Sequence, residues 1–148
     1  MMALRANRER GFTLIEMIVV VAILGILAAI AVPALISAVG RSRQRRTMAD
    51  MHNLAKANGT FAIDNRTFVD TLPDLEPDYM LGTPVNDAWG TPFQYTPGGG
   101  NLTYMLTSFG RLGAPGPAPP VLWTHEPYEA DIIMNTGQFI QAPRAQGS

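Results

Sequence analysis

The segment that decides the fold is GFTLIEMIVVVAILGILAAI, residues 11–30, which is apolar almost throughout and contains one acid, Glu16. The apolar run continues beyond it, so that residues 17–36 carry no charge, and twelve of these twenty residues are Ile, Leu or Val. Twenty helical residues span about 30 Å, the thickness of the hydrocarbon core of a bilayer. The run predicts a membrane-spanning helix, because a chain of 148 residues cannot cover such a helix on every side with its own core.

The flanks of this run leave its orientation open. Arg5, Arg8 and Arg10 precede it, and the sequence RSRQRR, residues 41–46, follows it. Basic residues normally mark the cytoplasmic side of a span, and here both sides are basic. A secretory signal peptide is disfavoured, because its apolar core is shorter, at about 7–15 residues. Three roles fit RSRQRR: a solvated flank that keeps the helix from sliding inward, a contact with anionic lipid head groups, or a contact with acids of a neighbouring head.

The rest of the chain is acidic. From residue 47 onward, ten Asp and Glu residues stand against four Lys and Arg residues, a net charge of −6. An acidic head argues against nucleic-acid binding, which uses clustered Lys and Arg. The chain contains no Cys, which excludes disulfides and thiolate catalysis. His52 and His125 are solitary, without zinc-site spacing or a catalytic motif, so we predict no enzymatic activity.

Glu16 is a carboxylate at the edge of an otherwise apolar helix. Its cost is at most about 3 kcal/mol, less than the roughly 5 kcal/mol by which the Ile, Leu and Val residues favour insertion. An acid in such a place is a functional candidate whose partner has to be found. Cleavage of the chain between Gly11 and Phe12 would create an α-amine one helical turn before Glu16. That amine is the expected partner, either in the same chain or in an adjacent copy.

These residues carry a family resemblance. The sequence RGFTLIE, residues 10–16, resembles the type III prepilin signal of type IV pilins and type II secretion pseudopilins, and the likeness extends along the apolar helix to Pro33. The resemblance implies cleavage after Gly11 by an inner-membrane prepilin peptidase and N-methylation of Phe12 by the same enzyme. It also implies a cytoplasmic N-terminus, and a Glu16 that docks onto the terminal amine of a neighbouring subunit in a growing filament.

Pro33 lies inside the predicted helix, where it removes one backbone donor and crowds the preceding turn. We expect a kink or local melting there. The resemblance implies that this segment unwinds during assembly, which makes Pro33 a candidate assembly residue beside Glu16. An ordinary kink in a membrane helix is the alternative, because Pro is common in such helices.

The remainder of the chain predicts a small head. The helix is expected to reach about residue 62, with Asn58-Gly59 as a weak point and an apolar stripe of Met48, Met51, Leu54, Ala55, Ala62 and Ile63. Residues 71–89 predict a loop-rich connector, residues 110–120 little regular structure, and the tail after residue 142 a mobile end. Alternating sequence predicts two strand pairs, 93–96 with 102–108 and 131–134 with 138–140. The side chains expected inside this antiparallel sheet are Phe93, Tyr95, Leu102, Tyr104, Leu106, Ile132 and Phe139.

Two head segments add to the resemblance. NDAWGTPFQY, residues 86–95, and YMLTSFG, residues 104–110, are similar to consecutive motifs of major pseudopilins. Major pseudopilins typically bind Ca²⁺ after the second motif, and Asp131 matches one of their ligands. Leu112, however, stands where they usually have another Asp, and losing one carboxylate weakens or abolishes a site that needs six to eight oxygens. Glu126 or Glu129 are possible substitutes, so calcium stays a doubtful cofactor and no other is predicted.

The sequence thus predicts a pilin-like α+β protein with a long N-terminal hydrophobic helix whose second half packs on a small antiparallel sheet. We expect a cleaved cytoplasmic leader (1–11), a transmembrane and assembly helix (12–36) and a periplasmic head (37–148). The expected function is that of a structural subunit of a type II secretion pseudopilus at the bacterial inner membrane. Its expected partners are the prepilin peptidase, other pseudopilins and the inner-membrane assembly platform. A type IV pilin, a minor pseudopilin, a subunit of a DNA-uptake filament and a membrane-anchored binding module stay open as alternatives.

Overall fold

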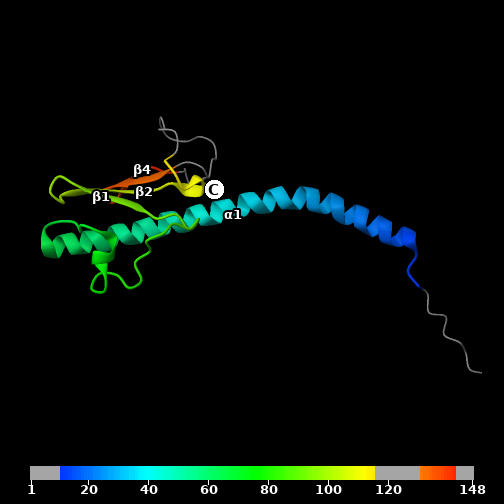
Figure 1. Ribbon diagram of the computed structural model, residues 1–148, viewed down its shortest axis with the longest axis horizontal. Coiled ribbons are helices and arrows are strands. Elements are labelled where there is room, and N and C mark those ends of the chain that lie inside the picture. The colour runs from blue at the N-terminus through cyan, green and yellow to red at the C-terminus, as the bar shows by residue number, and fades with distance from the viewer. Residues whose placement is uncertain (1–10, 116–130, 143–148) are drawn as a thin grey trace, which may run out of the picture. The chain divides into compact units, whose positions relative to one another are not determined.

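The computed structural model describes residues 11–115 and 131–142. The chain divides into two units, Met1–Ala38 and Val39–Ser148, and each is described by itself. One helix, α1 (Leu14–Asn65), runs through the boundary between them (Figure 1). Residues 1–10 of the predicted leader, residues 116–120 of the predicted irregular segment and the predicted mobile tail lie outside the described residues.

The first unit consists of the N-terminal part of α1, and no described side chain of this part is buried. Two side chains of the apolar run illustrate this: Phe12 is 76% exposed and Ile30 is 72% exposed. This part of α1 is long and apolar enough to cross a membrane, and none of its apolar window is covered by the chain itself. The helix is continuous through Pro33, so the expected local melting is not seen in the single chain.

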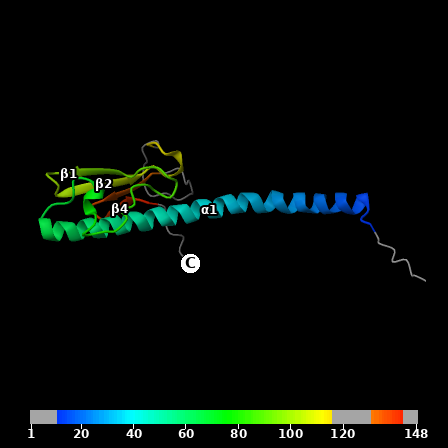
Figure 2. The same ribbon diagram turned by 60° about the horizontal axis from the view of Figure 1, so that its bottom comes forward.

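The second unit combines the rest of α1 with one antiparallel sheet of four strands in the order β1-β2-β3-β4. The strands are β1 (Gln94–Gly98), β2 (Thr103–Ser108), β3 (Ile132–Asn135) and β4 (Gln138–Gln141). In both views the sheet lies along the C-terminal part of α1 (Figure 2). The predicted α+β class and both predicted strand pairs are confirmed. Beyond the prediction, β2 also pairs with β3, which joins the two pairs into one sheet.

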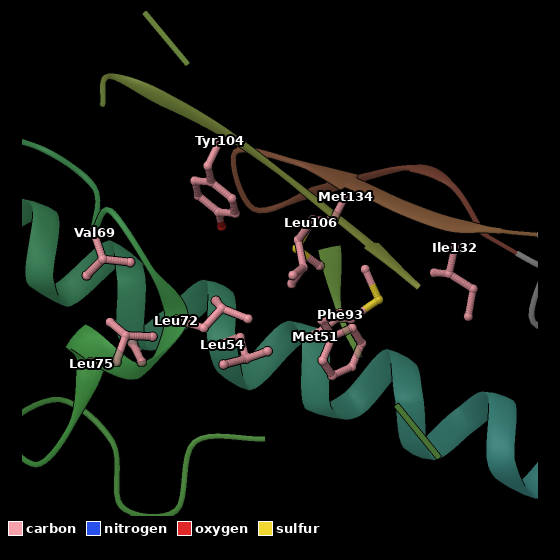
Figure 3. Close-up of a cluster of buried hydrophobic side chains, with 11 residues drawn as sticks. Met51, Leu54, Val69, Leu72, Leu75, Phe93, Tyr104, Leu106, Ile132 and Met134 are labelled. Atoms are coloured by element: carbon pink, nitrogen blue, oxygen red, sulfur yellow. The ribbon is translucent and has the colours of Figure 1, made fainter. Parts of the chain in front are cut away.

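The core of the second unit lies between α1 and the sheet. Met51 and Leu54 project from α1 toward Leu106 and Met134 of the sheet (Figure 3). A second group of buried side chains comes from the connector between α1 and β1: Val69, Leu72 and Leu75. Each of these side chains contributes about 1.5–3 kcal/mol by burial. The core therefore fixes the C-terminal part of α1 to the sheet.

Some local predictions are wrong. Asn58-Gly59 does not weaken α1, because the Asn58 side chain is 1% exposed and bonded within the core. Ile63 is 81% exposed, since the side of α1 that faces the sheet continues through Ala57 and Asn58 instead. Leu102 is 64% exposed, because it precedes β2 in the turn. Of these three residues, Asn58 has side-chain partners from distant parts of the chain, Val69 and Tyr95.

The two hairpin turns, 99–102 and 136–137, are short, whereas the connector from α1 to β1 covers residues 66–93. The connector contains a short 3-10 helix, η1 (Leu72–Leu75), and a second one, η2 (Gly110–Leu112), follows β2. Between β1 and β2, Gly99, Gly100 and Asn101 all have left-handed backbone angles, with φ of 58°, 68° and 61°. Two glycines and an asparagine tolerate this conformation best, which explains why the predicted turn forms there.

Candidate functional site

The start of α1 is organised by Glu16 and Thr13. The amide and the hydroxyl of Thr13 both donate to Oε2 of Glu16, each at 2.8 Å, and the Glu16 amide donates to Oγ1 of Thr13 at 3.3 Å. These reciprocal bonds form a capping box, which satisfies amide groups that a helix start otherwise leaves without partners. They explain why α1 begins at Leu14 and not at the predicted Phe12.

The capping box places the predicted cleavage and assembly residues together. Gly11 and Phe12 precede the helix in extended chain, and Phe12 and Glu16 line one shallow hollow with Ile15, Val19 and Val20. The carboxylate thus lies next to the backbone that would carry the new amine after cleavage at Gly11. Only Oε2 is used in the capping bonds, which leaves Oε1 available for a second donor.

Thr13 is a functional residue that the sequence interpretation missed. The signal was present, because Thr-x-x-Glu before an apolar run is the sequence signature of a capping box. The acid therefore has a role inside its own chain in addition to any role toward a neighbour. A substitution that removes the carboxylate removes both roles, and a test of assembly has to separate them.

In the head, the motif residue Asp87 holds a tight turn. Oδ1 of Asp87 accepts the amides of Trp89 and Thr91, both at 2.9 Å, and the Asp87 amide donates to the Thr91 carbonyl at 2.8 Å. The side chain is only 6% exposed, so these bonds replace the water that the carboxylate loses. The turn explains why an acid, an aromatic residue and a glycine recur at this spacing.

The same carboxylate joins the turn to the sheet and to the helix. Oδ2 of Asp87 accepts the hydroxyl of Ser108 at 2.7 Å, and the Ser108 oxygen accepts the Gly110 amide at 3.2 Å. On the other side of the turn, the Ala88 amide donates to Oγ1 of Thr47 in α1 at 3.1 Å. The two sequence motifs of the head are therefore one hydrogen-bonded unit that is attached to α1.

Comparisons with known proteins agree with these features. A profile described as the prokaryotic N-terminal methylation motif matches residues 6–32. The type II secretion system core protein G of Pseudomonas aeruginosa is 32% identical over 130 residues, which cover 76% of this chain and 91% of that protein. Core protein G of Vibrio cholerae is 30% identical over 129 residues, 76% of this chain and 87% of that protein.

The chain belongs to the family of type II secretion system core protein G. The resemblance predicted from RGFTLIE is thereby confirmed, and so is the pilin-like α+β fold class. A type IV pilin is also a relative: the type IV major fimbrial protein FimA of Dichelobacter nodosus is 36% identical over 102 residues, 68% of this chain and 65% of that protein. No solved structure matches the chain significantly.

In this member of the core protein G family, the structure describes only part of the predicted calcium site. Leu112, at the end of η2, is 51% exposed and offers no side-chain oxygen. Asp131 directly precedes β3, where it is half-buried and already takes part in an interaction. Within residues 11–115 and 131–142, no three His, Asp or Glu side chains gather into a group that could hold a metal. Glu126 and Glu129, the possible substitutes, lie outside the described residues.

A second hydrogen-bonded unit links α1, the connector and β1 of this core protein G relative. Nδ2 of Asn58 donates to the Tyr95 hydroxyl at 3.1 Å, this hydroxyl donates to the Val69 carbonyl at 2.9 Å, and the Val69 amide donates to Oδ1 of Asn58 at 3.1 Å. Burial raises the pKa of Tyr95. Burial, with a smaller effect from Tyr95, raises the pKa of Tyr104 to about 12.

Proposed function

We propose that the chain is a structural subunit of a type II secretion pseudopilus. In this proposal, residues 1–11 form a leader that prepilin peptidase removes after Gly11, and the new N-terminus at Phe12 is methylated. Residues 12–36 hold the subunit in the inner membrane and later form the filament core. Residues 37–148 form a periplasmic head, which puts the N-terminus in the cytoplasm.

One observation carries this proposal: the long apolar part of α1 is exposed along its whole length among the residues that the structure describes. Large apolar side chains along it are about half exposed or more, from Phe12 at 76% to Val39 at 44%. Apolar surface of this extent is unstable in water and has to be covered by lipid or by protein. A membrane covers it in the single subunit, and the helices of neighbouring subunits cover it in a filament.

The position of Glu16 supports assembly over simple anchoring. A carboxylate that enters an apolar filament core without a cation costs several kcal/mol. A plain membrane anchor gains nothing from an acid at this position. The amine that cleavage creates at Phe12 is the nearest available cation, and Oε1 of Glu16 is not engaged in the capping box. We infer that this amine, in the same or a neighbouring copy, meets Glu16 during assembly.

The remaining parts of the proposal follow from this assembly. The partners are the prepilin peptidase, further copies of this chain and other pseudopilins, and the inner-membrane assembly platform. Pro33 weakens α1 at a point where assembly requires the helix to unwind. We assign no catalytic residue and no cofactor, and calcium binding through Asp131 stays a prediction of weak or absent affinity because Leu112 supplies no carboxylate.

The test is to purify native filaments from cells that contain the secretion system and to measure the mass of the subunit N-terminus. The proposal predicts a subunit that begins at Phe12 and carries one extra methyl group. A Gly11→Trp variant should stay uncleaved and absent from filaments, because a bulky residue does not fit before the cut. Membrane-inserted protein that still begins at residue 1 or 2 in peptidase-positive cells contradicts the proposal.

A type IV pilin is the second candidate, because FimA shares 36% identity with this chain. The chain covers 65% of FimA but 91% of core protein G from Pseudomonas aeruginosa, which favours the secretion pseudopilus. Filament length decides between the two: a pseudopilus stays within the periplasm, and a pilus extends from the cell. A membrane-anchored binding module is the remaining alternative, and it predicts full function after loss of Glu16.

A further inference from the structure

Charge is segregated along the second unit. Residues 41–56 contain five Lys or Arg and one acid, a net charge of +4 with His52 neutral. Residues 64–78 contain five acids and one Arg, a net charge of −4. No charged residue lies between the two segments. The equal and opposite charges of two segments on one chain suggest that the segments are complementary surfaces.

The positive segment lies on α1, and its Arg43, Arg45, Arg46 and Lys56 side chains are all exposed. At 100° per residue, Arg43 and Arg46 lie about 20° and about 80° from the direction of Leu54, so the basic face itself consists of Arg45 and Lys56. Arg45 and Lys56 project from the side of α1 opposite to Leu54, which points into the core, because successive helical residues are rotated by 100°. Nε of Arg46 lies 3.8 Å from Oδ2 of Asp50, and this pair at the surface neutralises little of the charge. The head does not cover this face.

The negative segment is the acidic connector, residues 64–78, which packs at the C-terminal end of α1. Tyr79 fixes it there: its ring lies 5.2 Å from the Phe61 ring, and its hydroxyl donates to Oδ2 of Asp64 at 3.1 Å. Asp70 accepts a hydrogen bond from Asn101, Glu76 accepts one from the Thr83 amide, and Asp74 accepts one from the Thr71 amide within the connector itself. All five acids are exposed. The carboxylates are therefore presented to the outside in ordered positions.

The two surfaces cannot neutralise each other within one chain. Arg45 and Asp64 are separated by nineteen residues of α1, which corresponds to about 28 Å along the helix. Charges are screened beyond about 8 Å at physiological ionic strength. A parallel second copy that is displaced along the helix by about this length brings the basic face of one copy opposite the acidic connector of the other.

We propose that the basic face of one copy docks on the acidic connector of a second copy, about 30 Å away along the helix axis. The docking rests on the proposed function, because a filament holds its subunits parallel and axially staggered. Ile63, which is 81% exposed on α1 between the two surfaces, adds an apolar contact to the same interface. Anionic lipid is the competing partner of the basic face, but lipid leaves the ordered carboxylates of the connector without a role.

Charge reversal in the full-length chain tests the docking. One strain carries Arg45→Glu with Lys56→Glu, a second carries Asp64→Lys with Asp78→Lys, and a third carries all four changes. Asp64 and Asp78 are chosen because both are exposed, and only one side-chain bond, from the Tyr79 hydroxyl to Asp64, is lost. The control carries Gln94→Glu with Gln138→Glu, two exposed positions outside both surfaces. Filaments are counted at low and at high salt, and a thermal melt of each variant shows whether its head is folded.

We expect each double reversal to reduce filament number about tenfold or more, because like charges then face each other across the interface. The fourfold variant should recover most of the loss, since the attraction is restored with the signs exchanged. The control should behave as the native chain, and raising the salt should weaken native filaments. No recovery in the fourfold variant overturns the docking. A loss that follows only from the changes in the basic face also overturns it and identifies lipid as the partner of that face.

The outcome for the proposed function is read separately. If the native chain is not cleaved and forms no filaments, the proposed function fails before the charge variants are compared. If native filaments form, and neither reversal changes their number, the function stands and the docking is wrong.

Discussion

The role of Asp87 gives a quantitative prediction for the stability of the head. Its carboxylate accepts the amides of Trp89 and Thr91 and the hydroxyl of Ser108, and Ser108 is 0% exposed. An Asp87→Ala change leaves these three donors without an acceptor. Each unsatisfied buried donor costs about 1–3 kcal/mol, and water can reach the two half-buried amides in part. We therefore expect Asp87→Ala to lower the free energy of unfolding by about 3–5 kcal/mol.

The assay is urea unfolding of the head, residues 37–148, followed by circular dichroism. We expect this fragment to fold alone, because the core of the second unit uses no residue before Thr47. With a denaturant slope of about 1–3 kcal/mol per molar urea, the predicted loss lowers the midpoint by about 2 M. Asp87→Asn should lose less, about 1–2 kcal/mol, because its amide oxygen still accepts the two backbone amides.

Asp78→Ala is the matched control, because Asp78 is an exposed acid of the same head. Surface changes of this kind stay within about 0.5 kcal/mol. If Asp87→Ala unfolds at the same urea concentration as Asp78→Ala, the hydrogen-bonded turn does not stabilise the head. The account of the two head motifs as one structural unit would then be wrong.

Three further predictions concern the head. Asn58→Ala should lower the free energy of unfolding by about 2–4 kcal/mol in the urea assay, because the Tyr95 hydroxyl and the Val69 amide both lose a partner in a buried place. The pKa of Tyr104 is raised to about 12 in the folded head, so as the pH rises the unfolded chain loses the Tyr104 proton before the folded chain does. The free energy of unfolding should therefore fall as the pH rises from about 10 to about 12. Tyr104→Phe should reduce that fall, and an unchanged pH profile in this variant contradicts the prediction. Millimolar calcium, or its removal by a chelator, should leave the melting temperature of the native head nearly unchanged. In the Leu112→Asp variant, calcium should raise the melting temperature. A large effect of calcium on the melting temperature of the native head contradicts this prediction.

Much of the fold follows from patterns within short stretches of sequence. The length of the apolar run predicts α1 and its exposed first part, because insertion depends on the summed hydrophobicity of about twenty residues. Alternation in residues 102–108 predicts β2, and Tyr104 and Leu106 are buried as expected. Such signals are local, so they survive without knowledge of the tertiary structure.

The parts that sequence reasoning missed depend on partners far away in the chain. The sequence predicts that Asn58 weakens the helix. In the folded head, however, its side chain forms hydrogen bonds with Val69 and Tyr95, which are distant in the sequence. Asp87 reads as a turn residue, and its bond to Ser108 spans 21 positions. Thr13 is different, because its capping role with Glu16 was readable from the sequence signature.

The central claim is that the charge of Glu16 drives assembly, and two substitutions separate this charge from helix capping. Glu16→Gln removes the charge but keeps an oxygen for Thr13, since Gln also serves in a capping box. Thr13→Val removes the capping hydroxyl but keeps the charge. Neither change should prevent membrane insertion, because the first removes a charge from the edge of the span and the second adds an apolar side chain.

The decisive measurement is the number of native filaments from cells that produce the full-length chain as Glu16→Gln, as Thr13→Val or unchanged, with cleavage after Gly11 checked by mass. We expect all three forms to be cleaved and Thr13→Val to assemble at a reduced level. Glu16→Gln should form about a hundredfold fewer filaments than the unchanged chain, which is equivalent to roughly 3 kcal/mol for an unpaired amine in the filament core. Co-production of the native chain should partly restore the incorporation of Glu16→Gln if the pair forms between copies. Filaments of Glu16→Gln as numerous as those of the native chain would contradict the account, because the carboxylate would then serve only to cap its own helix.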